Sequence, residues 1–201
     1  MRAARGVLRH QALLFGSLAR WLLPRRRLPL DGQEFGYARG QGAMLFGLAF
    51  AGVVETAGMA VLLRHHPVAH TVMLVLDVYG VLFAVALHAA SVVRPHLLDG
   101  ELLRVRQSAQ VDLPVPLADI ASVRRESRAT HTRADGELDL PVGAQTSVTL
   151  ELARPVTHLT VLGRSREIRL VRFQADDADA VVRAVERARA ALSPLPPGPV
   201  G

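Results

Sequence analysis

The sequence AMLFGLAFAGVVETAGMAVLL, residues 43–63, decides the fold class of this chain. Sixteen of its 21 residues are apolar, and a second stretch, residues 71–93, has 18 apolar residues of 23. About 20 apolar residues in a helix cross one bilayer, so both stretches are predicted to be transmembrane helices. A buried helical hairpin in a soluble protein is the alternative, and two adjacent spans of this length are unusual in a soluble core.

The composition of the whole chain agrees with membrane segments. Half of the 201 residues are hydrophobic, only 4% are aromatic and the mean hydropathy is +0.23, which is too apolar for a disordered chain. The length leaves room for about one ordinary domain beside the two helices. The absence of Cys excludes disulfides, thiolate zinc sites and a cysteine nucleophile.

Charge predicts the orientation of the two helices. The loop of residues 64–70 between them is short, so the helices are antiparallel neighbours. Residues 1–40 hold eight Arg against two acids, the loop holds one Arg, and residues 94–201 are nearly neutral, with 15 Arg against 14 acids. By the positive-inside rule, we expect a multi-pass plasma-membrane protein with both termini in the cytoplasm and the loop outside.

Residues 1–40 are predicted to hold a basic amphipathic helix that lies on the membrane. Val7, Leu14, Leu18 and Trp21 fall on one face of a helical wheel, while arginines and Ser17 fall on the opposite face. Such a helix suits the anionic cytoplasmic leaflet, which attracts basic groups. The basic residues predicted to face the membrane surface are Arg5, Arg9, Arg20, Arg25, Arg26 and Arg27.

Residues 1–40 also allow three other interpretations. A flexible basic tail that only enforces topology remains open. A secretory signal is disfavoured, because the apolar core ALLF is short and no small-x-small cleavage pattern follows. Nucleic-acid binding is disfavoured, because an apolar face interrupts the arginines and the cytoplasmic domain is nearly neutral.

Ionisable residues interrupt both predicted membrane helices. Glu55 lies on a stripe of small residues in the first helix, and Asp77 and His88 share a stripe in the second. The two carboxyl groups are predicted to lie at similar depths, where they cannot both be charged cheaply. They form either a proton- or cation-linked site or neutral hydrogen bonds that hold helices together, and the second interpretation is favoured because two helices enclose no pathway.

The outer loop contains three histidines that invite a metal interpretation. His65, His66 and His70 would suffice to bind zinc. Pro67 disturbs a helix between the last two, and no HExxH pattern exists, so we expect no metal and no cofactor.

After Arg94-Pro95 the sequence alternates between apolar and polar residues, which indicates strands. Asp99-Gly100 and 163–165 are turn signals, and 176–192 predicts a helix with an apolar face. Residues 94–192 are therefore predicted to form a cytoplasmic β-domain, followed by a disordered tail at 193–201. The predicted strands are 102–106, 110–115, 121–126, 147–153, 156–162 and 167–173, with an edge strand around 138–140 in a long loop over 128–145.

At this point the chain resembles a family, the bacterial membrane proteins that carry a pleckstrin-homology-like domain. The likeness covers about residues 43–190 and rests on the order of short motifs. They are Glu55 and Tyr79 in the helices, RPHLLDGELLRVR from Arg94, VPLADIASVRRE from Val115, and the helix that opens at DDADA. The resemblance implies a small antiparallel β-barrel or sandwich capped by a C-terminal helix.

The resemblance also implies a non-catalytic, membrane-tethered adaptor. It does not imply phosphoinositide binding, since QSAQVD after Arg106 is uncharged apart from Asp112. No GxSxG, GxGxxG or phosphate-binding glycine loop is present, so we expect no enzyme activity.

Three hypotheses of function follow. The first is an interaction protein that presents its domain under the anionic inner leaflet to an unidentified protein partner, alone or as a homo-oligomer, and binds no nucleic acid. The second is a transport component that uses Glu55, Asp77 and His88, and the third is a metal-dependent enzyme that uses the outer histidines.

Overall fold

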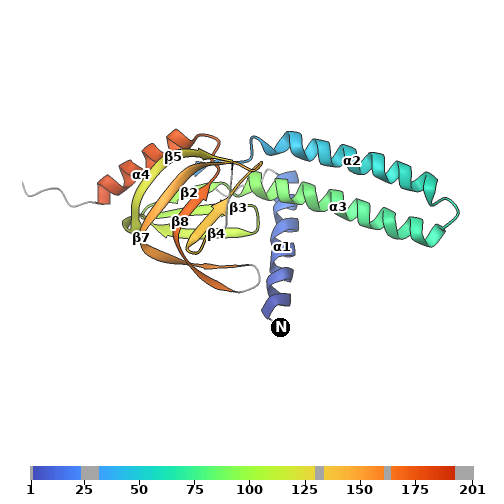
Figure 1. Ribbon diagram of the computed structural model, residues 1–201, viewed down its shortest axis with the longest axis horizontal. Coiled ribbons are helices and arrows are strands. Elements are labelled where there is room, and N and C mark those ends of the chain that lie inside the picture. The colour runs from blue at the N-terminus through green and yellow to red at the C-terminus, as the bar shows by residue number, and fades with distance from the viewer. Residues whose placement is uncertain (1, 24–31, 130–133, 161–163, 193–201) are drawn as a thin grey trace, which may run out of the picture.

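The computed structural model of the chain describes residues 2–23, 32–129, 134–160 and 164–192, and it holds a helical hairpin beside a two-sheet domain (Figure 1). The predicted tail at 193–201 and the triplet Arg25, Arg26 and Arg27 lie outside the described residues. The α-helices of the described part are α1 (Arg2–Leu22), α2 (Gln41–Leu62), α3 (Pro67–Val93) and α4 (Ala178–Leu192).

Helices α2 and α3 form an antiparallel hairpin that extends away from the β-domain (Figure 1). Both are long and apolar enough to cross a membrane, as predicted. Helix α3 starts four residues before the predicted start, because Pro67 occupies its first turn, where a proline is tolerated. The connection is therefore shorter than the predicted loop of residues 64–70.

The first sheet has the strand order β1-β2-β3-β4, with all neighbours antiparallel. Its short strand β1 comes before α2 in the sequence and pairs with β2, which begins three residues after α3 ends. The membrane-type hairpin is thus inserted between two neighbouring strands of one sheet. The strands are β1 (Gln33–Phe35), β2 (His96–Asp99), β3 (Leu102–Gln107) and β4 (Val111–Pro116).

The second sheet has the order β5-β7-β8-β6, and α4 lies beside it (Figure 1). Its strands are β5 (Ile120–Arg128), β6 (Glu137–Leu140), β7 (Thr146–Leu159) and β8 (Ser165–Phe173). Strand β6 pairs with β8 in parallel, which corrects the prediction of a purely antiparallel domain. Over the described residues the sheets remain two separate four-stranded sheets, so of the predicted barrel or sandwich a closed barrel is not formed.

One hydrophobic core joins the two sheets and α4. Leu103 and Val105 come from the first sheet, Val148 and Leu150 from the second, and Val181 from α4, and each is fully buried. The alternation of apolar residues along the strands places these side chains on the inner faces. The amphipathic face predicted for the C-terminal helix is the face that closes this core.

Three strands differ from the sequence prediction, and one of them, β2, was not among the predicted strands. The predicted strands 147–153 and 156–162 are one long strand, β7, with a register shift between Glu151 and Val156. Strand β1 was not predicted. A Cβ at Gly32, which has φ of +132°, would lie 2.5 Å from the Leu98 carbonyl oxygen, so glycine permits the approach of this segment to β2.

Helix α1 forms as predicted and runs across α3 near the β-domain rather than along it (Figure 1). Leu14 is fully buried against Ala86 and Ala90 of α3. The predicted polar position of Ser17 is wrong, because Ser17 is buried and donates a hydrogen bond to the Leu13 carbonyl oxygen (2.7 Å). This local bond satisfies the hydroxyl and lets it pack in the contact.

Candidate functional site

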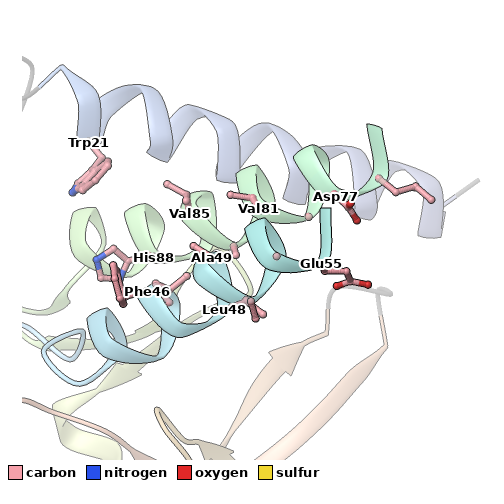
Figure 2. A pocket seen from close by; sticks show the side chains of 15 residues that line it. Trp21, Phe46, Leu48, Ala49, Glu55, Asp77, Val81, Val85 and His88 are labelled. Atoms are coloured by element: carbon pink, nitrogen blue, oxygen red, sulfur yellow. The ribbon is translucent and has the colours of Figure 1, made fainter. Parts of the chain in front are cut away.

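A pocket of about 580 Å³ lies between α2 and α3 and contains all three predicted polar residues of the hairpin (Figure 2). Its lining is mostly apolar. Glu55 and Asp77 lie at one end, and His88 lies at the other, beside Trp21 of α1. Since Asp77 and His88 are 11 residues apart, helical rise separates the two ends by about 16 Å.

At the acidic end of the pocket, the Thr56 hydroxyl contacts the Asp77 carboxyl. The hydroxyl oxygen of Thr56 lies 2.9 Å from the Asp77 carboxyl and 2.8 Å from the Gly52 carbonyl oxygen. A hydroxyl has one hydrogen to donate. The hydroxyl can therefore serve only one of these two oxygens at a time, and it links Asp77 of α3 to the turn of α2 that contains Gly52.

Glu55 and Asp77 come to the same pocket without bonding to each other among the described residues. Asp77 is half-buried at the seam of the hairpin, where it also lines a second pocket of about 540 Å³ on the Thr56 side. Glu55 is exposed and points into the first pocket (Figure 2). The arrangement has the chemistry to exchange a proton or to attract a cation.

The opposite end of the pocket is aromatic. The rings of Trp21 and His88 meet edge to face, with centroids 6.3 Å apart. The His88 Nδ1 atom is buried and has no hydrogen-bond partner among the described residues. Trp21 thereby connects the amphipathic helix to the polar residues of the hairpin, which helical-wheel reasoning on α1 alone did not show.

The three histidines of the predicted loop, His65, His66 and His70, are not gathered into one cluster in the described part of the chain. His66 is the residue before α3 and has non-helical backbone angles, so it does not share a helical face with His70. His65 accepts a hydrogen bond from Arg64 (2.9 Å). Within the described ranges, no group of three or more potential metal ligands is assembled.

The remaining basic residues predicted at the membrane surface are placed only in part. Arg20 is exposed near the end of α1. Arg5 and Arg9 belong to the same helix, but their side chains are outside the description.

A buried polar network joins the end of α3 to the first sheet. The Tyr37 hydroxyl accepts a hydrogen bond from the Ser108 N–H (2.6 Å) and is also bonded to Ser91 of α3. The Ser108 hydroxyl in turn donates to the Leu87 carbonyl oxygen of α3 (3.1 Å). Burial of the Tyr37 hydroxyl raises its pKa, so it stays protonated. The turn between β3 and β4 is therefore fixed to the hairpin.

The buried ring of His96 packs against the ring of Tyr37. Its ring lies between those of Tyr37 and Phe173, with both centroid distances 4.7 Å. Its Nδ1 accepts from the Arg106 N–H (3.0 Å), so Nε2 is the protonated nitrogen and donates to the Gln174 carbonyl oxygen (2.8 Å). Complete burial lowers the pKa of His96 to about 4, and the ring is neutral near pH 7.

An arginine cluster lies next to the network. The guanidinium groups of Arg94, Arg104 and Arg106 converge on Asp112, with nitrogen–oxygen distances of 3.1, 3.8 and 3.5 Å. The sequence pattern indicated only that the segment after Arg106 is uncharged apart from Asp112, and it did not predict this cluster. The strand register, which pairs Arg106 with Asp112, is the signal that brings these residues together.

Comparisons with protein-family models, curated proteins and solved structures found no match to this chain.

Proposed function

We propose that this chain is a non-enzymatic membrane-anchored interaction protein. In this proposal α2 and α3 cross the plasma membrane and both termini are cytoplasmic. The two-sheet domain is a pleckstrin-homology-like module that binds a protein partner under the inner leaflet, as an adaptor or as a subunit of a membrane assembly.

The observation that carries the proposal is the close attachment of the domain to the hairpin. Only Arg94 and Pro95 separate α3 from β2. The bonds from Tyr37 to Ser108 and from Ser108 to Leu87 then tie the sheet to the helix on a second side. A domain held in this way is presented at a fixed height and orientation below its anchor, which suits the capture of a partner at the membrane surface.

Two further features support the pleckstrin-homology-like assignment. Two sheets share one core, and an amphipathic C-terminal helix closes it. The parallel strand β6 and the added strand β1 are departures from the arrangement that the resemblance implies.

Cross-linking in the native membrane tests the proposal. A photo-reactive residue at Arg183, exposed on α4, and one at Val61, exposed on α2, are compared in the full-length chain. The proposal predicts a defined partner protein linked through position 183 and recovered by a C-terminal tag. Cross-links from position 61 alone, or only between copies of the chain, would contradict it.

A proton- or cation-linked transport component is the second candidate, and the pocket that gathers Glu55, Asp77 and His88 favours it. The double variant Glu55→Gln/Asp77→Asn separates the two. Under the interaction proposal the variant keeps partner capture, and proteoliposomes with either protein show the same background ion flux. A flux that is present in the wild type and lost in the variant would favour transport.

A further inference from the structure

The arginine cluster of Arg94, Arg104 and Arg106 carries more positive charge than its surroundings compensate. Asp112 is the acid that faces all three in the described part of the chain. A carboxylate offers about four lone-pair sites, whereas each guanidinium carries about five N–H donors. Most of the donors of this cluster therefore have no acceptor in Asp112.

Burial makes this excess costly. The side chains of Arg94 and Arg106 are only 15% and 10% exposed, so water has limited access to them. Burial is also the largest cause that lowers the pKa of Arg94, and the charges of Arg106 and Arg20 act in the same direction. Arg104 and Asp112 are more open, at 41% and 33%, and form the accessible side of the cluster.

The position of the cluster along the hairpin matches the phosphate layer of a bilayer. Helix α2 has 22 residues, about 33 Å of helical rise, which is close to the hydrocarbon thickness of a membrane. Counting from the connection at Leu62 and Pro67, the start of α2 is level with His88 of α3. Arg94 is six residues further, about 9 Å past the hydrocarbon edge, where headgroup phosphates lie.

The cluster is also held in place before any ligand arrives. The guanidinium groups of Arg94 and Arg106 are already paired with Asp112 (3.1 and 3.5 Å), and the backbone N–H of Arg106 is fixed by His96 (3.0 Å). Arginines held in this way lose little freedom when they bind, and their planar forks match the oxygens of a phosphate group.

We propose that Arg94, Arg104 and Arg106 bind the phosphate group of an anionic lipid headgroup in the inner leaflet. The phosphate oxygens occupy the open side of the cluster, where Arg104 is exposed, and compete with Asp112 for the guanidinium donors. This inference rests on the proposed membrane anchoring. It adds a specific lipid site to the general attraction expected of the basic α1.

Lipid titration of the full-length protein in a neutral detergent, read by native mass spectrometry, tests the proposal. The probes are phosphatidylglycerol, zwitterionic phosphatidylcholine and inorganic phosphate. We expect phosphatidylglycerol to bind at least about tenfold more tightly than phosphatidylcholine, because charge-assisted bonds from arginine favour the net negative headgroup. We also expect millimolar inorganic phosphate to leave the lipid bound.

Matched variants locate the binding. Arg104→Gln should weaken phosphatidylglycerol binding about tenfold, and Arg104→Lys should retain more of it than Arg104→Gln. Asp112→Asn removes a competing negative charge and should strengthen binding several-fold. Arg183→Gln, which changes an exposed arginine on α4, should have no effect.

Equal affinity for the two lipids, or equal losses in Arg104→Gln and Arg183→Gln, would overturn the lipid site. Displacement of the lipid by inorganic phosphate would show a soluble-anion site and would also overturn it. A failure of the proposed anchoring is detected separately. Single cysteines introduced into the hairpin connection and into the domain, and labelled in cells, report on membrane topology without reference to lipid binding.

Discussion

Large apolar side chains are exposed in the hairpin and buried in the β-domain. Phe46 and Val61 of α2 are 76% and 69% exposed, and no residue of α2 is buried, whereas Leu103 and Val148 of the domain are completely buried. A chain can leave so many large apolar side chains uncovered only where the surroundings are themselves apolar. The comparison teaches that the hairpin is suited to apolar surroundings, whereas the domain covers its own apolar side chains.

The largest expected effect on the free energy of unfolding comes from truncating a side chain in the core of the domain. Leu103→Ala should lower the free energy of unfolding by about 2–5 kcal/mol, because it removes buried methyl groups and leaves a cavity. Leu62→Ala at the 71% exposed end of α2 should change it by less than about 0.5 kcal/mol. Denaturant unfolding of the full chain in detergent measures both, and equal losses would contradict the comparison.

An added charge should affect the hairpin more than the domain, which is the opposite of the effect of removing apolar groups. Val54→Arg places a charge near the middle of α2, where it should oppose membrane insertion by about 3 kcal/mol. Leu159→Arg, at a site in β7 that is 67% exposed, should leave insertion unchanged. The inserted fraction of each variant in membranes is the measurement. Full insertion of Val54→Arg would contradict a lipid-facing position for residue 54.

The junction between the two regions should weaken in acid. The pKa of His96 is about 4 in the fold and about 6.5 when unfolded, so the unfolded chain takes up the proton first as the pH falls. This contribution is complete above pH 6.5 and is lost toward pH 4, by about 3 kcal/mol in all. Thermal unfolding across this pH range measures it.

The variant His96→Gln serves as the control for that experiment. It should unfold more easily at pH 7 and lose the part of the pH dependence that His96 supplies. His158, whose pKa is also lowered by burial, leaves a residual slope of the same sign. An unchanged slope in His96→Gln would show that His96 does not link stability to pH.

The smallest effects are expected for ion pairs, and their burial should rank them. Arg172, whose side chain is 9% exposed, donates to Glu137 (2.7 Å) and Asp139 (3.0 Å), so Arg172→Gln should cost about 1–3 kcal/mol. Arg125 and Asp179 form a pair that is mostly in solvent, and Arg125→Gln should cost less than about 1 kcal/mol. The same denaturant experiment ranks them, and the reverse order would be contrary to this account.

The sequence predicted features that depend on local patterns. Apolar length located α2 and α3, and amphipathic spacing located α1 and α4. The stripes on the hairpin also indicated that Glu55 and Asp77 could approach each other, and the structure places both in one pocket. Each of these depends on a period that a single helix carries in its own residues.

The features that were missed depend on residues far apart in the chain. Strand β1 has three residues and forms only because β2, some 60 residues later, offers an edge. The parallel pairing of β6 and the pairing of Arg106 with Asp112 likewise follow from strand register, which alternation alone does not specify. His96 was not singled out, since its neutral state comes from tertiary burial.

The membrane orientation of the two regions is the central claim, and cysteine labelling tests it most directly. Because the chain has no Cys, His65→Cys in the hairpin connection and Ala118→Cys in the domain each create a unique thiol. With a membrane-impermeant maleimide, we predict that His65→Cys is labelled on intact cells and Ala118→Cys only after permeabilisation. Labelling of Ala118→Cys on intact cells, or protection of His65→Cys, would contradict the account.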